Sequence, residues 1–185
     1  MPSWSRIATR MRVPLGFLFA AAYLWFAKPA WTWLAIGTLF IVAGLGLRAS
    51  AAGHIRKNRE LTITGPYAYT RNPLYLGSIL IAVGFLVAAR NPWIATASLV
   101  MFFAIYLPVI GAEEKYLDAT FSNYAEYAAE VPRLFLRLSP YNPSGGDVRG
   151  SFSRELYLKH REYQAALGSA LMLLALMIKI ILVNR

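Results

Sequence analysis

The chain has 185 residues, of which 57% are hydrophobic and only 15% are charged, against about 25% charged residues in an average soluble domain. This composition argues against a soluble globular protein and against disorder, and the lack of cysteine excludes disulfides, thiolate metal sites and cysteine nucleophiles. In so apolar a chain, the net charge of +10 indicates a membrane protein with positive cytoplasmic loops, not a nucleic-acid-binding protein.

Five segments are free or nearly free of charge: 13–27, 30–47, 74–89, 92–112 and 165–183. A membrane-spanning helix needs about 20 apolar residues. The second and fourth segments meet this length, and the first and third need flanking residues to complete them. The fifth carries Lys179 near its end, where a long side chain can reach the membrane surface. We therefore predict an all-α, polytopic membrane protein with about five transmembrane helices, forming a single integral-membrane domain over 1–185.

The distribution of Lys and Arg predicts the orientation. If the N-terminus is cytoplasmic and five helices alternate in direction, 15 of the 19 basic residues fall on the cytoplasmic side and four on the other side. This bias is what the positive-inside rule describes. Both long polar segments, about 48–73 and 113–164, are then cytoplasmic, and we expect any polar chemistry to lie there.

The first polar segment contains two turn signals, Gly65-Pro66 and Asn72-Pro73. Pro73 suits the first position of a helix, with Asn72 as its cap. The start of this helix then carries Arg71 and free amide groups, which is a favourable place for an anionic group. Composition alone favours the simpler interpretation, which is helix capping plus an ordinary positive-inside arginine.

The second polar segment opens with Glu113-Glu114 directly after the fourth apolar run. Apolar residues then recur at helical spacing up to Val131, which predicts one amphipathic helix over 114–131. Residues 151–164 are interpreted as a charged helix that leads into the fifth apolar run. His54 and His160 are far apart and show no metal-ligand spacing, so we predict no metal site. No βαβ pattern exists, which excludes a Rossmann-type enzyme.

Two motifs, taken together, resemble those of a known family. Gly65-Pro66-Tyr67, followed by Arg71-Asn72-Pro73 and then Tyr75 and Gly77, is similar to the first signature of the integral-membrane methyltransferases. Glu113-Glu114, followed at fixed spacings by Leu117, Phe121, Tyr124, Tyr127 and Val131-Pro132-Arg133, is similar to the second. The family includes isoprenylcysteine carboxyl methyltransferases and phospholipid methyltransferases. On this basis 1–57 forms an N-terminal helical hairpin, 58–137 the methyltransferase core, and 138–185 a cytoplasmic loop with the C-terminal helix.

The resemblance implies S-adenosylmethionine as the cofactor, bound without a Rossmann fold. It implies cofactor contacts from Glu60, Leu61, Tyr67, Asn72, Pro73, Leu74, Tyr75 and Glu113. The candidate catalytic residues are Arg71, which suits the carboxylate of the cofactor, and Glu114, which suits a general base that Glu113 could replace. We also expect residues 60–62 to be strand-like and to help form a slot for adenine.

The acceptor is predicted to be a lipophilic, membrane-embedded molecule, with membrane lipids as partners. Asn72 replaces the histidine that is usual in the family, and Val109 replaces an arginine that contacts the carboxylate substrate of the carboxyl methyltransferases. Both departures favour a lipid amine, as in phospholipid N-methylation. The alternatives are a carboxyl O-methyltransferase, a membrane oxidoreductase similar to sterol reductases, and a non-enzymatic membrane protein.

Overall fold

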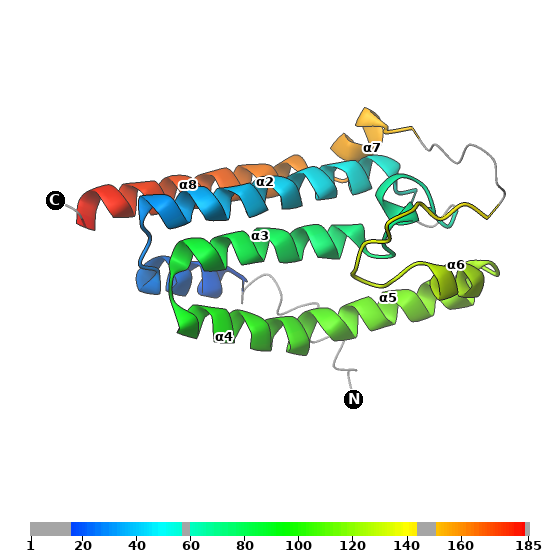
Figure 1. The fold of residues 1–185 in the computed structure, drawn as a ribbon, viewed down its shortest axis with the longest axis horizontal. Helices are drawn as coiled ribbons and strands as arrows, with labels where there is room; N and C mark the ends of the chain where they lie inside the picture. The colour runs from blue at the N-terminus through cyan, green and yellow to red at the C-terminus, as the bar shows by residue number, and fades with distance from the viewer. Residues whose placement is uncertain (1–15, 57–59, 144–150, 184–185) are drawn as a thin grey trace.

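The structure is a computed structural model that describes residues 16–56, 60–143 and 151–183. Within these residues, all five predicted apolar segments are helical. The long helices lie side by side with their axes roughly parallel (Figure 1). Over the described ranges the fold is all-helical and contains no strand, so the predicted strand-like 60–62 is an irregular segment. The helices are Gly16–Phe26, α2 (Trp31–His54), η1 (Gly65–Ala68), α3 (Pro73–Ala89), α4 (Pro92–Met101), η2 (Phe102–Tyr106), α5 (Leu107–Thr120), α6 (Tyr124–Glu130), α7 (Arg154–Lys159) and α8 (Tyr163–Val183).

Three helices are long and apolar enough to cross a membrane: α2, the continuous Pro92–Thr120, and α8. The helix Gly16–Phe26 and α3 are apolar but shorter. The 17 residues of α3 extend about 26 Å, slightly less than the hydrocarbon thickness of about 30 Å. Three helices therefore support the predicted class, a membrane-spanning protein. The predicted number of five transmembrane helices is not established.

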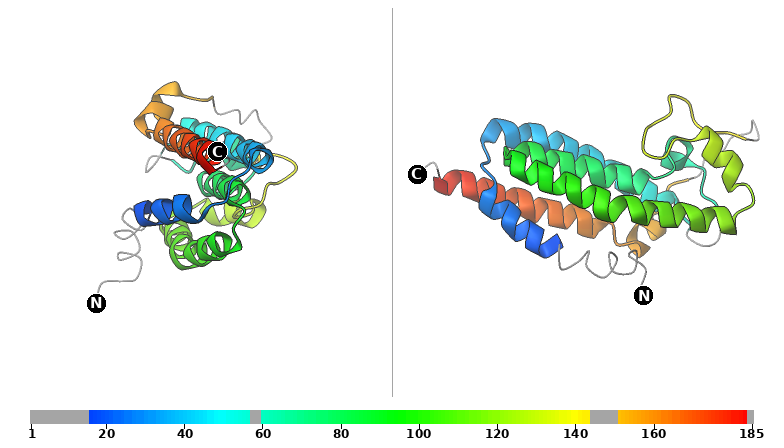
Figure 2. Two further views of the ribbon diagram at one scale, coloured as in Figure 1. Left: turned by 90° about the vertical axis from the view of Figure 1, so that its left-hand side faces the viewer. Right: turned by 90° about the horizontal axis from the view of Figure 1, so that it is seen from below.

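Helix α2 packs against α3 through two pairs of facing glycines. A Cβ atom placed on Gly44 would lie 2.5 Å from the carbonyl oxygen of Gly77, and a Cβ on Gly37 would collide with the carbonyl oxygen of Gly84. Small residues at such contacts let two helix backbones approach closely, which is how helices associate in membranes. Between the two pairs, Ile41 is fully buried. Seen along the bundle, α2 contacts α8 as well (Figure 2).

Lys179 on α8 holds the end of the helix Gly16–Phe26. Its ammonium group donates to the carbonyl oxygens of Leu24, at 2.6 Å, and of Trp25, at 2.9 Å. The last carbonyls of a helix have no partner within the helix, so they are good acceptors for a cation. Lys179 thus bonds to a neighbouring helix end, where the sequence predicted a side chain reaching towards the membrane surface.

The predicted single helix over 114–131 is wrong. Helix α5 ends at Thr120, Phe121 is extended, and α6 begins only at Tyr124. The break turns the tyrosines of α6 inward, where Tyr124 and Tyr127 pack with Val131 and Tyr141 in a separate small core. The apolar spacing therefore identified residues that are buried or partly buried, but these residues lie on two separate helices, α5 and α6.

The predicted helix over 151–164 is also interrupted. Helix α7 ends at Lys159, and Arg161 adopts a left-handed backbone with φ of 55° before α8 starts at Tyr163. Helix α2 ends at His54, and residue 57, the predicted end of the N-terminal hairpin, lies outside the described residues. The turn between α7 and α8 places Glu162 beside α2.

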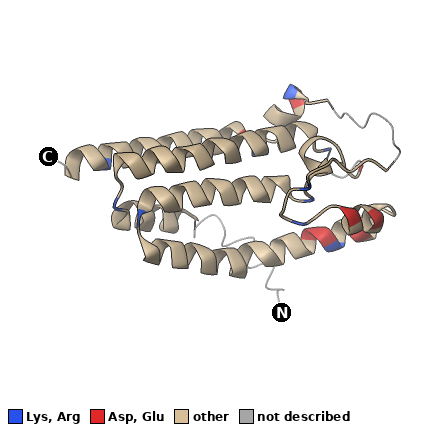
Figure 3. Ribbon diagram, in the orientation of Figure 1, with Lys and Arg blue, Asp and Glu red and all other residues tan. Residues whose placement is uncertain are grey.

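The polar elements gather at one end of the bundle. There η1, α6 and α7 lie close to the ends of α2 and α3 (Figure 1), and most charged side chains cluster at this end (Figure 3). The two long polar segments of the sequence therefore meet in space, as expected for segments that leave the membrane on the same side.

We expect Gly44→Ala to lower the melting temperature of the detergent-purified protein by about 3–10 °C, because its methyl group would push α2 away from α3. Gly46→Ala is the matched control, since a Cβ at Gly46 meets no atom within 4 Å. Alanine favours helix, so Gly46→Ala should leave the melting temperature unchanged or raise it slightly. Equal melting temperatures for the two variants would contradict the close-contact interpretation.

Candidate functional site

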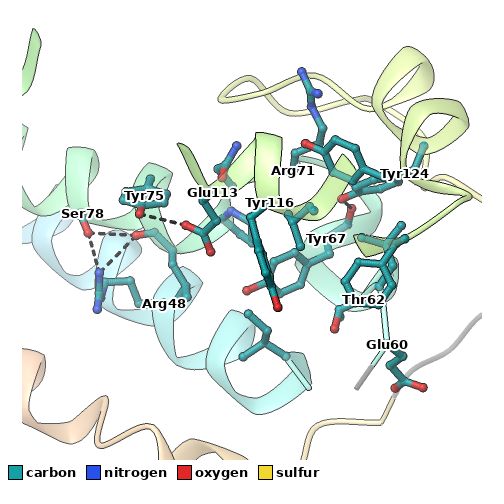
Figure 4. A pocket seen from close by; sticks show the side chains of 18 of the residues that line it. Arg48, Glu60, Thr62, Tyr67, Arg71, Tyr75, Ser78, Glu113, Tyr116 and Tyr124 are labelled. Atoms are coloured by element: carbon teal, nitrogen blue, oxygen red, sulfur yellow. Dashed lines mark hydrogen bonds between the residues drawn. The ribbon is translucent and has the colours of Figure 1, made fainter. Parts of the chain in front are cut away.

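A cavity of about 430 Å³ lies at the polar end, between α2, α3, α5 and the segment that joins α2 to α3. Figure 4 shows Arg48 and Ser78 at one end of it, and Arg71 with Tyr124 at the other. All eight residues predicted to bind the cofactor line this one cavity, and Arg71 lines it too. Their binding role stays a prediction.

The Tyr75–Glu113 pair joins the start of α3 to α5 across the cavity. The hydroxyl of Tyr75 donates to Glu113 Oε2 at 3.0 Å (Figure 4). The Tyr75 ring also meets Tyr106 edge-on, with 6.3 Å between the ring centres. Tyr106 belongs to η2, a π-helical turn just before Pro108, and such turns are rare and frequent at functional sites. This region thus combines one carboxylate with two aromatic rings.

Glu114, the neighbour of Glu113, is not among the residues that line the cavity and is only 8% exposed. Arg133 donates to both of its carboxylate oxygens, and the guanidinium of Arg71 lies 3.7 Å from Oε1. Asn72 Nδ2 adds a hydrogen bond of 3.4 Å. These contacts tie α5 to the residues just before α3. The predicted role of Glu114 as a general base, which needs access to a substrate proton, stays a prediction.

Asn72 occupies the cap position of α3, as predicted, but its side chain does not cap the helix. Its amide donates to Glu114 and, at 3.2 Å, to the carbonyl oxygen of Arg133. The backbone N–H of Arg71 donates to the carbonyl oxygen of Pro132 at 2.9 Å. The two motifs of the sequence are therefore bonded directly to each other.

Three polar atoms of residues in the cavity wall are buried and have no hydrogen-bond partner among the described residues: Tyr67 Oη, Arg71 Nε and Tyr124 Oη. Burial raises the pKa of Tyr67, and the negative charge of Glu113 raises it further, so the phenol stays protonated. Since buried polar groups normally have partners, these three atoms are candidates for contacts with a bound ligand.

Sequence reasoning missed the polar residues Arg48, Ser78 and Glu162, all of which line the cavity. Arg48 lies four residues after Gly44, on the face of α2 that meets α3, and a Cβ on Gly77 would lie 2.6 Å from Arg48 Cγ. An arginine on the same helical face as Gly37, Ile41 and Gly44 is the signal that could have identified it. Glu162 carries no comparable signal. The missed aromatic residues of the wall are Tyr106, Tyr116, Phe121, Tyr124 and Tyr127.

A second, apolar cavity of about 680 Å³ lies between the helix Gly16–Phe26, α3, α4 and η2. Its walls are mainly aliphatic and aromatic side chains of the apolar helices. It shares three lining residues with the polar cavity, namely Tyr75, Ser78 and Tyr106. The two cavities therefore meet at these residues, which we call the junction.

The chain matches two curated relatives. It is 35% identical over 133 residues to the cobalt-zinc-cadmium resistance protein CzcN of Cupriavidus metallidurans, covering 66% of this chain and 61% of the relative. It is 30% identical over 135 residues to the nickel-cobalt-cadmium resistance protein NccN of Alcaligenes xylosoxydans xylosoxydans, covering 68% and 63%. The match thus spans a little over three fifths of each relative. No solved structure matches the chain.

The family model for phospholipid methyltransferases matches residues 34–124. This range contains α2, α3 and α5, the first motif, and the acidic pair that opens the second motif. The match confirms the resemblance that the motifs predict: over residues 34–124 the chain is similar to the phospholipid methyltransferase family.

Proposed function

We propose that the chain is an S-adenosylmethionine-dependent methyltransferase that acts on a lipophilic acceptor within the membrane. One observation carries this proposal: the polar cavity lined by the motif residues shares Tyr75, Ser78 and Tyr106 of its wall with an apolar cavity. A polar donor and an apolar acceptor can then meet at one place. The Lys and Arg bias supports a cytoplasmic position for this end of the bundle.

The residues of the polar cavity fit the cofactor. When bound, S-adenosylmethionine supplies a methyl group activated by a sulfonium centre. Glu113 can accept hydrogen bonds from hydroxyl or ammonium groups, and Arg71, with the positive end of the α3 dipole, can hold a carboxylate. Tyr67 Oη and Arg71 Nε supply polar atoms that still need a partner. The volume of about 430 Å³ lies within the range of about 300–1,000 Å³ for ligand pockets.

The apolar cavity suits the hydrocarbon part of the acceptor, and its nucleophile would then lie at the junction. Holding the nucleophile and the methyl group in line is the main contribution expected of the protein. Glu113 accepts a hydrogen bond from Tyr75, one of the junction residues, whereas Glu114 does not line the cavity. We therefore assign the role of proton acceptor to Glu113. A carboxylate beside aromatic rings suits an amine acceptor, in keeping with Val109 and Asn72.

Both curated relatives are named for resistance to metal ions. For this chain we propose only that a membrane methyltransferase of this type can act in cells exposed to metal ions.

Calorimetry of the detergent-purified protein should show binding of S-adenosylmethionine in the micromolar range, about −8 kcal/mol. Glu113→Gln should weaken this binding by about tenfold or more, because the cavity loses a charged acceptor. Glu126→Gln, on the exposed side of α6, is the matched control and should bind as the wild type does. A folded wild-type protein that binds neither this cofactor nor S-adenosylhomocysteine would refute the proposed function.

Ala82→Phe should fill part of the apolar cavity and lower methyl transfer to lipids by about tenfold or more, while the cofactor affinity stays unchanged. Ala43→Phe places the same bulk on an exposed position of α2 outside that cavity and is the control. The measurement is transfer of a labelled methyl group from S-adenosylmethionine into extracted lipids. Equal transfer rates for the two variants would show that the acceptor does not use this cavity.

The same labelled lipids identify the acceptor class. Methyl esters are cleaved by alkali, whereas N-methyl groups survive it, so we expect most of the label to be stable to alkali. Release of the label as methanol would instead establish the carboxyl O-methyltransferase alternative.

A further inference from the structure

Arg48 and Glu162 form a bidentate ion pair in the wall of the polar cavity. Arg48 Nε and Nη2 donate to the two carboxylate oxygens of Glu162 at 2.9 and 2.8 Å. The two side chains are only 22% and 12% exposed. The remaining nitrogen, Nη1, donates to Ser78 Oγ at 2.5 Å and to the carbonyl oxygen of Leu74 at 3.2 Å (Figure 4). Arg48 thus links Glu162 to the first turns of α3.

Glu162 lies outside residues 34–124, the range that matches the family model. The segment that carries it is nonetheless fixed to the end of α2. The backbone N–H of Ser153 donates to the carbonyl oxygen of Gly53 at 2.9 Å, and the Phe152 ring packs directly on Gly53, where any Cβ would collide with it. His160 Nδ1 lies 3.2 Å from the carbonyl oxygen of Ala52. The C-terminal segment therefore adds a charged residue to the cavity in a defined position.

The charges that line the cavity do not balance. Two cations and three anions line it, which leaves an excess of one negative charge; they are Arg48, Arg71, Glu60, Glu113 and Glu162. Removing the charge of any one of the three acids brings this sum to zero, and Glu162 is the one that is paired with Arg48. Burial is the largest cause that raises the pKa of Tyr67; Glu113 and Glu162 raise it further and Arg48 lowers it, so these charges act on the same part of the cavity.

We propose that Glu162 is a positioning residue that offsets the charge of Arg48 and so lets the cavity prefer the positively charged methyl donor to its by-product. This inference rests on the proposed function. At neutral pH S-adenosylmethionine has a net charge of +1, since its sulfonium and ammonium groups outnumber its carboxylate, whereas S-adenosylhomocysteine has none. A cavity with one excess negative charge therefore binds the donor more tightly and releases the by-product more readily.

The test is the ratio of the two dissociation constants, that for S-adenosylhomocysteine divided by that for S-adenosylmethionine, measured by calorimetry. Glu162→Gln should lower this ratio by about 3- to 15-fold, the effect of one charge at about 10 Å with an effective dielectric constant of about 20 and partial salt screening. Arg48→Gln should raise it by a similar factor. The double variant Arg48→Gln/Glu162→Gln has the wild-type charge sum, and its ratio should return to within about twofold of the wild-type value.

The matched control is Glu155→Gln, which removes the same charge from an exposed position of α7 and should leave the ratio unchanged. If Glu162→Gln weakens the binding of both ligands by the same factor, or the double variant keeps the ratio of Glu162→Gln, the charge role is wrong and the pair only supports the fold. Should Glu162→Gln fail to fold, Arg48→Gln and the double variant still decide the question. A wild type that binds neither ligand would refute the proposed function itself, which is a different result from an unchanged ratio.

Discussion

The close contact between α2 and α3 sets the geometry of the polar cavity, whose wall includes Arg48 of α2 and the first turns of α3. Gly44 meets the backbone of Gly77 with no room for a side chain, so the helix axes approach as near as the backbones allow. Arg48 lies one turn further along α2, and only at this separation can it reach Ser78 and the carbonyl oxygen of Leu74. A wider spacing would remove these hydrogen bonds and leave Nη1 of Arg48 without a partner beside the cavity, which is costly for a buried polar group.

Residues at the start of α3 also position the acidic pair of α5. Tyr75 follows directly after Leu74 and holds Glu113 at the cavity wall. Glu114 is rotated by about 100° around α5 relative to Glu113, so it projects from a different side of the helix. It is held there by Arg133, Arg71 and Asn72. The two adjacent carboxylates therefore have different surroundings: Glu113 lines the polar cavity, and Glu114 bonds to residues of both motifs. We propose that only Glu113 contacts a ligand.

Short-range patterns predicted much of the molecule. The apolar runs gave the positions of five helices, and the motifs identified eight residues that do line one cavity. Patterns failed where the structure depends on contacts distant in sequence. The Arg48–Glu162 pair joins residues 114 positions apart, and the break at Phe121 depends on a core that Tyr141 completes. The roles of Glu113 and Glu114 could not be separated either, because adjacent residues of a helix differ only in the neighbours that they face.

We propose that the polar cavity holds the methyl donor with its reactive end at the junction of the two cavities. A structure of the protein with bound S-adenosylhomocysteine, determined in a lipid nanodisc, tests this most directly. We predict that the ligand lies between Tyr67, Arg71 and Glu113, with its sulfur atom towards Tyr75, Ser78 and Tyr106. A ligand bound elsewhere, or one whose sulfur atom points away from the apolar cavity, would contradict this account.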